Sequence, residues 1–64
     1  MFKELQEATL VARTRTGKNL GTSVKGGLFT VEDISYDSNG RSTVKKLTEP
    51  LSLEQAVLFL SEVQ

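Results

Sequence analysis

Few residues of this chain have side chains suited to catalysis. Among its 64 residues there is no cysteine and no histidine, so it has neither a thiol nucleophile nor an imidazole base. The same absence excludes zinc sites of the finger or ribbon type. Paired carboxylates can do acid–base chemistry only inside a pocket that perturbs them, and a chain this short rarely encloses one. We therefore expect a protein that is not an enzyme, uses no cofactor and holds no metal.

One segment, residues 13–27, combines cations, hydroxyl groups and glycines in a way that suits phosphate binding. Its candidate nucleic-acid-binding residues are Arg13, Arg15, Lys18 and Lys25. The segment is not a P-loop, because Gly17-Lys18 is followed by Asn19 instead of serine or threonine. The pI of about 6.2 also argues against nucleic acid, since domains that bind it are usually basic overall. Nucleic-acid binding is therefore the alternative function and not the leading one.

The size and charge of the chain indicate a single small domain. Eight basic and eight acidic residues give a formal net charge of zero. A domain of this size buries only about 60% of its unfolded surface, and without disulfides or metals the remaining aid is an oligomer or a partner. The N-terminal residues lack the layout of a signal peptide, and the longest apolar run, residues 56–60, is far shorter than a membrane span. We expect a cytoplasmic protein with no membrane contact.

A C-terminal helix is the element that the sequence indicates most clearly. Ser52 is a typical N-cap, and Gln55 three residues later completes a capping box. The apolar residues that follow recur at helical spacing and form one face: Leu53, Ala56, Val57, Leu60 and Val63. Phe59 flanks this face, whereas Leu58 falls on the polar side.

Before this helix the sequence predicts a β-hairpin, with strands over residues 28–36 and 41–48. Two loops are compatible with the turn residues. A two-residue loop at Asn39-Gly40 would place Ile34 opposite Lys45. A three-residue loop with Gly40 in the left-handed conformation places Ile34 opposite Val44, and it pairs each charge with one of opposite sign. We therefore predict the three-residue loop.

The N-terminal third is read as a short helical or irregular start over residues 2–8 and a strand over 9–16, which is rich in threonine and valine. Residues 17–27 are either a flexible loop or a loop with a weak strand over residues 20–24. The predicted fold class is α+β: a small three-stranded, mainly antiparallel sheet, with a C-terminal helix packed on one face and a short N-terminal helix as an option.

Such a sheet has more apolar surface than one helix can cover. In the predicted register one face carries Leu28, Ile34, Tyr36 and Val44, and the other carries Phe29, Val31 and Leu47. The second face needs the N-terminal segment, a second protomer in a homodimer, or a protein partner, unless a bulge near Glu32-Asp33 brings both sets to one side. The predicted partner-binding residues are Phe29, Val31 and Leu47, with Leu58 as an outlier.

The edges of the sheet offer another route to a partner. An exposed edge strand can pair with a second copy of the chain or with a strand of another protein. Lys45 and Lys46 are equally well explained as residues that protect an edge from such pairing.

The order of a helix-like start, three strands and a C-terminal helix resembles the double-stranded-RNA-binding domain over about residues 28–63. Residues 29–32 and Asn39-Gly40 take the places of its middle strand and turn. Those domains begin their last helix with a cluster of lysines, whereas this one begins Ser52-Leu53-Glu54-Gln55, so RNA binding is not carried over. The β-β-α end also resembles small antitoxins and phage-encoded inhibitors, at the level of the fold alone.

The function that the sequence favours is a non-enzymatic protein-binding module. We expect a small regulator or inhibitor, of the kind that phages and mobile elements encode, which acts by occluding a partner's surface. A third option is a small structural subunit of a larger assembly, in which residues 17–27 become ordered on contact.

Overall fold

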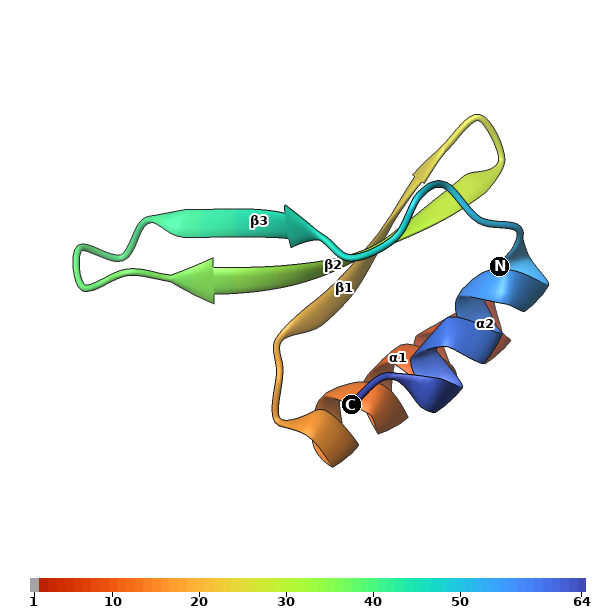
Figure 1. Cartoon of the computed structure of the whole chain (residues 1–64), viewed down its shortest axis with the longest axis horizontal. Coiled ribbons are helices and arrows are strands. Elements are labelled where there is room, and N and C mark those ends of the chain that lie inside the picture. The colour runs from red at the N-terminus through yellow and green to blue at the C-terminus, as the bar shows by residue number, and fades with distance from the viewer. Residues whose placement is uncertain (1) are drawn as a thin grey trace.

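The computed structural model describes residues 2–64 and has an α+β fold, as predicted. The elements follow one another along the chain as α1 (Lys3–Thr16), β1 (Leu20–Lys25), β2 (Leu28–Tyr36), β3 (Ser42–Lys46) and α2 (Leu53–Glu62). The strands form one antiparallel sheet in the order β1-β2-β3, and both helices lie side by side on the same side of it (Figure 1). None of the helices within residues 2–64 is long and apolar enough to cross a membrane.

The N-terminal helix is longer than the sequence suggested. The strand predicted over residues 9–16 is wrong, because α1 continues through this segment. Leu5 and Ala12 are seven residues apart, which places both on one side of a helix, and both are buried in the core. Burial of this side outweighs the β-propensity of the neighbouring threonine and valine residues.

The threonines of α1 bond to the helix backbone through their hydroxyl groups. Each donates to the carbonyl four residues earlier: Thr9 to Leu5 at 2.7 Å, Thr14 to Leu10 at 3.0 Å and Thr16 to Ala12 at 2.7 Å. The helix ends at Gly17, whose φ of 73° lies in the left-handed region and whose N–H donates to the Arg13 carbonyl at 2.9 Å.

The first strand of the sheet is β1, which a tight turn joins to β2. Of the two options for residues 17–27, the strand over residues 20–24 is the one that the structure contains, and it extends to Lys25. The three strands of the sheet are therefore not those expected from the sequence, since the first lies after residue 16 and not before it.

The predicted register of the hairpin is confirmed. Ile34 lies opposite Val44, Asp33 opposite Lys45 and Glu32 opposite Lys46. Gly40 has a φ of 79°, a left-handed conformation that side chains disfavour, as the three-residue loop requires. The Asp37 carboxylate holds this loop by accepting the N–H groups of Asn39 and Arg41, each at 2.9 Å.

The connection from β3 to α2 stays attached to the sheet. After Leu47, whose N–H donates to the Val31 carbonyl at 2.8 Å, the chain leaves β2 and returns at Leu51. There Leu51 and Phe29 exchange two backbone hydrogen bonds, both of 2.7 Å. Ser52 then begins α2 with the capping box that the sequence predicted.

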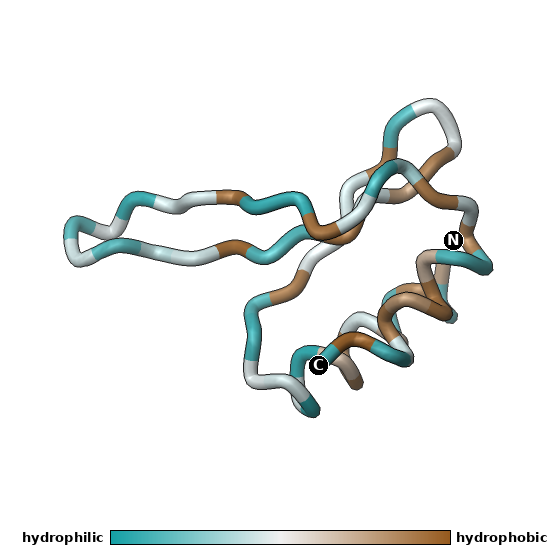
Figure 2. Tube along the Cα trace, viewed as in Figure 1, coloured by the Kyte–Doolittle hydropathy of each residue, from teal (hydrophilic) through white to brown (hydrophobic). Residues whose placement is uncertain are grey.

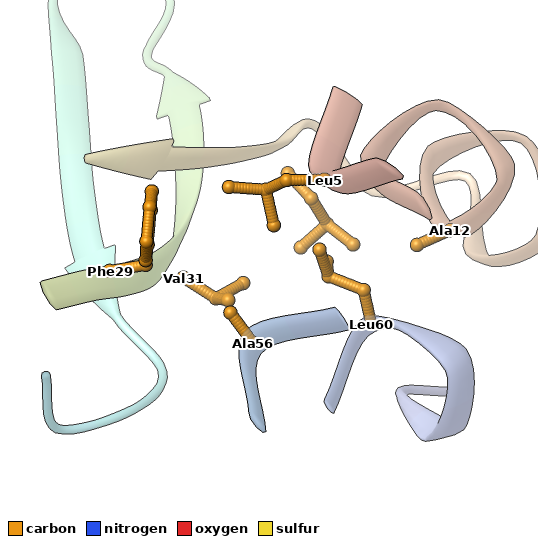
Figure 3. Packing of buried hydrophobic residues seen from close by; sticks show 7 residues of the cluster. Leu5, Ala12, Phe29, Val31, Ala56 and Leu60 are labelled. Atoms are coloured by element: carbon orange, nitrogen blue, oxygen red, sulfur yellow. The ribbon is translucent and has the colours of Figure 1, made fainter. Parts of the chain in front are cut away.

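The core fills the space between the sheet and the two helices. Figure 3 shows side chains from α1, β2 and α2 that point into this one space. The buried members are Leu5, Ala12, Leu20, Phe29, Val31, Ala56 and Leu60, and no polar or charged residue within 2–64 is buried with them. The predicted apolar face of α2 is confirmed, since all its members lie in this core or pack against it.

Candidate functional site

The face of the sheet that points away from the helices is apolar at several positions. Side chains alternate along β2, so Leu28, Ile34 and Tyr36 lie opposite to the buried Phe29 and to the helices. Val44 on β3 pairs with Ile34 and shares its face. Three of the four are exposed, at 65% for Tyr36, 51% for Val44 and 44% for Leu28, and Ile34 is half-buried. No helix covers this face in the described chain (Figure 1).

Three of these residues, Ile34, Tyr36 and Val44, gather where β2 and β3 project beyond the helices. This projecting part, residues 33–45, is called the arm here. Figure 1 shows it extending away from both helices, and Figure 2 shows it as mainly hydrophilic with short hydrophobic stretches on both strands. All five residues of β3 are exposed. The arm thus has an apolar face, which we call the arm patch (Ile34, Tyr36 and Val44).

The opposite face of the arm is polar. Ser35 and Thr43 lie opposite one another there, followed by Asp33 and Lys45 toward the helices. Each of these residues is adjacent in sequence to a member of the arm patch, so the two faces can be compared by substitutions one position apart. The arm is therefore amphipathic although neither helix packs on it.

Ile34 is the member of the arm patch whose side chain contacts β1. A Cβ atom placed at Gly21 of β1 would lie 3.4 Å from Ile34 Cδ1, so the isoleucine side chain lies across the glycine. Gly21 thereby leaves the open face flat where Ile34 crosses it. The remaining two members, Tyr36 and Val44, lie beyond the residues that pair with β1.

The partner-binding residues predicted from the sequence do not form an exposed surface. Phe29 and Val31 are 4% and 0% exposed and belong to the core, while Leu47 is half-buried against it. Of the covers considered for their face, the N-terminal segment is the one that the structure contains, because the full length of α1 joins α2 on that side. Leu58 is 58% exposed on α2, on the helical layer and not on the sheet.

Two of the predicted nucleic-acid-binding residues have partners within the chain. The Arg15 guanidinium donates to the carbonyl of Leu60 at 2.7 Å and also to the carbonyl of Val63. Lys18 Nζ donates to the Gln64 carbonyl at 2.7 Å. The last turn of α2 has no basic residue of its own, so these cations satisfy carbonyls and offset the partial negative charge at its end.

The other two predicted cations lie apart. Arg13 lines a shallow depression with Gly17 and Lys18 where α1 ends. Lys25 is at the opposite end of β1, and a strand of this length spans about 17 Å. The four cations therefore do not form one patch on this fold.

The structure reveals the arm patch instead, and the register that the sequence predicted already places its members on one face. What the sequence did not indicate was which face the helices cover. Within residues 2–64 no group of acidic side chains is arranged to hold a metal ion. Comparison with protein-family models, with curated proteins and with solved structures finds no match to this chain.

Proposed function

We propose that this chain is a non-enzymatic protein-binding module that contacts its partner through the arm patch. The supporting observation is the arm itself: Ile34, Tyr36 and Val44 share one face of a projecting hairpin, and neither helix covers them. Exposed apolar residues that gather on one face are typical of protein-binding surfaces, and tyrosine is enriched among the residues that carry binding energy.

The charges around the arm patch favour a protein over a nucleic acid. Lys46 shares the open face with Glu32 directly opposite, so the two charges offset one another. Phosphate contacts supply most of the affinity for nucleic acids, and a face with paired charges offers few cations for them. An apolar surface on another protein is the better complement.

The mode of action that suits this shape is occlusion. A hairpin that stands away from its own core can cover a partner's surface without any change in the fold of the chain. A small cytoplasmic regulator or inhibitor, of the kind that phages and other mobile elements encode, would act in this way. Such a role needs no catalytic group.

The test uses the two faces of the arm as each other's control. A photo-cross-linking amino acid is placed at Tyr36 in one variant and at Ser35 in another, and both are irradiated in cells of the native host. We expect one defined protein adduct from position 36 and little from position 35. In the same cells Val44→Lys should abolish the adduct, whereas Thr43→Lys should preserve it.

Equal cross-linking from the two faces would contradict the proposal, as would an adduct that survives Val44→Lys. Each variant is first compared with the parent chain by circular dichroism. Because all the substituted side chains are exposed, we expect their stabilities to differ from the parent by no more than about 0.5 kcal/mol.

A further inference from the structure

The outer edge of β1 carries backbone groups that lack a partner strand. The Ile34 N–H donates to the Asn19 carbonyl at 3.0 Å, which fixes the alternation of the ladder between β1 and β2. The backbone N–H and C=O groups of residues 21, 23 and 25 therefore point toward β2. Those of Leu20, Thr22 and Val24 point away from β2, toward the open edge. In the described chain β1 pairs with β2 alone.

The two edges of the sheet differ in how they are protected. β3 ends in Lys45-Lys46, and charged residues of this kind discourage edge-to-edge pairing. β1 has no charged residue before its last position, Lys25, and it contains no proline. Of the two edges, β1 is thus the one open to a further strand.

The sequence of β1 is complementary to itself when two copies run antiparallel about Thr22. Leu20 then lies opposite Val24 of the second copy, and Gly21 lies opposite Ser23, while Thr22 meets its own counterpart. Apolar residues meet apolar ones, small residues meet small ones, and no like charges are opposed. The outward backbone groups of residues 20, 22 and 24 are the ones that such a pairing would use.

The side of α1 next to this edge is also incompletely covered. Phe2 packs edge-on against Phe29, with ring centres 4.9 Å apart, yet it is 48% exposed. Together with Gln6 and Val24 it lines a shallow groove between α1 and β1. Leu10, four residues after Gln6 and on the same side of α1, is 64% exposed. A second copy paired along β1 would be adjacent to this surface.

The exposed area of the chain is large for its mass. A folded monomer of 7.0 kDa is expected to expose about 4,000 Å², whereas this chain exposes 4808 Å². The projecting arm and the uncovered side of α1 both contribute to this excess of about 800 Å².

We propose that two copies of this chain form a symmetric dimer by antiparallel pairing of β1 with β1, centred on Thr22. The pairing joins the two sheets into one continuous sheet, with the helices of both copies on one side. The open faces of both copies then lie on the other side, so a dimer would present two arm patches. The dimer does not depend on the arm patch binding anything.

The first experiment measures mass by sedimentation equilibrium from micromolar to submillimolar concentration. We expect a species of twice the 7.0 kDa chain mass. Thr22→Pro removes an N–H that only the second copy would use, and it should raise the dissociation constant at least about tenfold. Ser42→Pro is the matched control, because its N–H faces outward on the β3 edge. It should leave the dimer intact.

Thr22→Lys is a second variant that keeps the backbone donor, in case proline disturbs the strand. It opposes two like charges at the symmetry axis and should also give monomer. A monomeric parent chain at the highest concentration overturns the proposal. So does a folded dimer that both Thr22 variants leave unchanged.

The second experiment tests the geometry with an introduced cysteine, since the chain has none of its own. Directly opposed residues of a hydrogen-bonded antiparallel pair have Cα atoms about 5.5 Å apart, within reach of a short bifunctional thiol cross-linker. Thr22→Cys should therefore be cross-linked by such a reagent to a covalent dimer, and Ser42→Cys should not. Cross-linking at position 42 that is as fast as at position 22 would overturn the proposed pairing.

Discussion

The two halves of β2 differ in what covers them, although they belong to one continuous strand. In the first half Phe29 and Val31 are almost completely buried by the helices, whereas Ser35 on the same face of the second half is exposed. Both halves pair with neighbouring strands in a regular register. Strand pairing alone therefore does not decide burial, and the position of the helices divides the sheet into a half that stabilises the fold and a half that is available as surface.

The largest expected loss of stability distinguishes the two halves of β2 directly. Leu60→Ala removes a side chain that is 1% exposed beneath the first half of β2, and it should cost about 2–5 kcal/mol through lost burial and a cavity. Val44→Ala on the arm should change the free energy of unfolding by no more than about 0.5 kcal/mol. Urea denaturation of both variants checks the difference. Similar losses would mean that the arm contributes to the core after all.

A smaller loss is expected when the helix that covers β2 loses its cap. The Ser52 side chain accepts the Gln55 N–H, and Ser52→Ala leaves this donor without its partner. The cost should be about 1 kcal/mol of unfolding free energy. Ser61→Ala, at an exposed position of the same helix, is the control and should cost less. Thermal unfolding followed by circular dichroism compares the two.

The cations at the other end of α2 should contribute less. Arg15→Ala removes the hydrogen bonds to the Leu60 and Val63 carbonyls and should cost about 0.5–1 kcal/mol at low salt. Because Arg15 is exposed, the loss should shrink as salt screens its charge. Arg13→Ala, in the same last turn of α1, is the control. An equal, salt-independent loss in both variants would show that the contact with α2 is not the cause.

The effect of a substitution at the tip of the arm is expected to stay local to the loop. Gly40→Ala introduces a side chain at a φ of 79°, which should strain the loop by about 1 kcal/mol. We expect faster hydrogen exchange at the Asp37 amide, which bonds to the Arg41 carbonyl, with exchange at the Phe29 amide nearly unchanged. Equal acceleration at both amides would show that the arm and the core open together.

The elements that the sequence predicted correctly are those defined by local chemistry. The capping box at Ser52 and the spacing of apolar residues locate α2 without knowledge of the rest of the chain. The hairpin register follows from charge pairing and from the left-handed Gly40, which are also properties of adjacent segments. Such features are encoded within about a dozen residues, and so they can be inferred directly.

The incorrect predictions concern features that depend on distant segments. The threonines of α1 favour a strand by propensity, and only packing of Leu5 and Ala12 against the rest of the core makes the segment helical. With a shorter α1, the sequence leaves one helix to cover the sheet and predicts Phe29 and Val31 as partner-binding residues. The error at the candidate site therefore follows from the error in the helix, while the alternation of side chains on β2 was correct.

The contact of Arg15 with the end of α2 has a consequence for the rate at which the fold is lost. Its hydrogen bonds join residues 45 and 48 positions apart in the sequence. We expect a contact between segments so far apart in the sequence to form late, after the hairpins have formed locally. An interaction absent from the folding transition state acts on the unfolding rate and leaves the folding rate nearly unchanged. Arg15 would thus slow unfolding, so the folded state of this small domain would last longer than its equilibrium stability alone suggests.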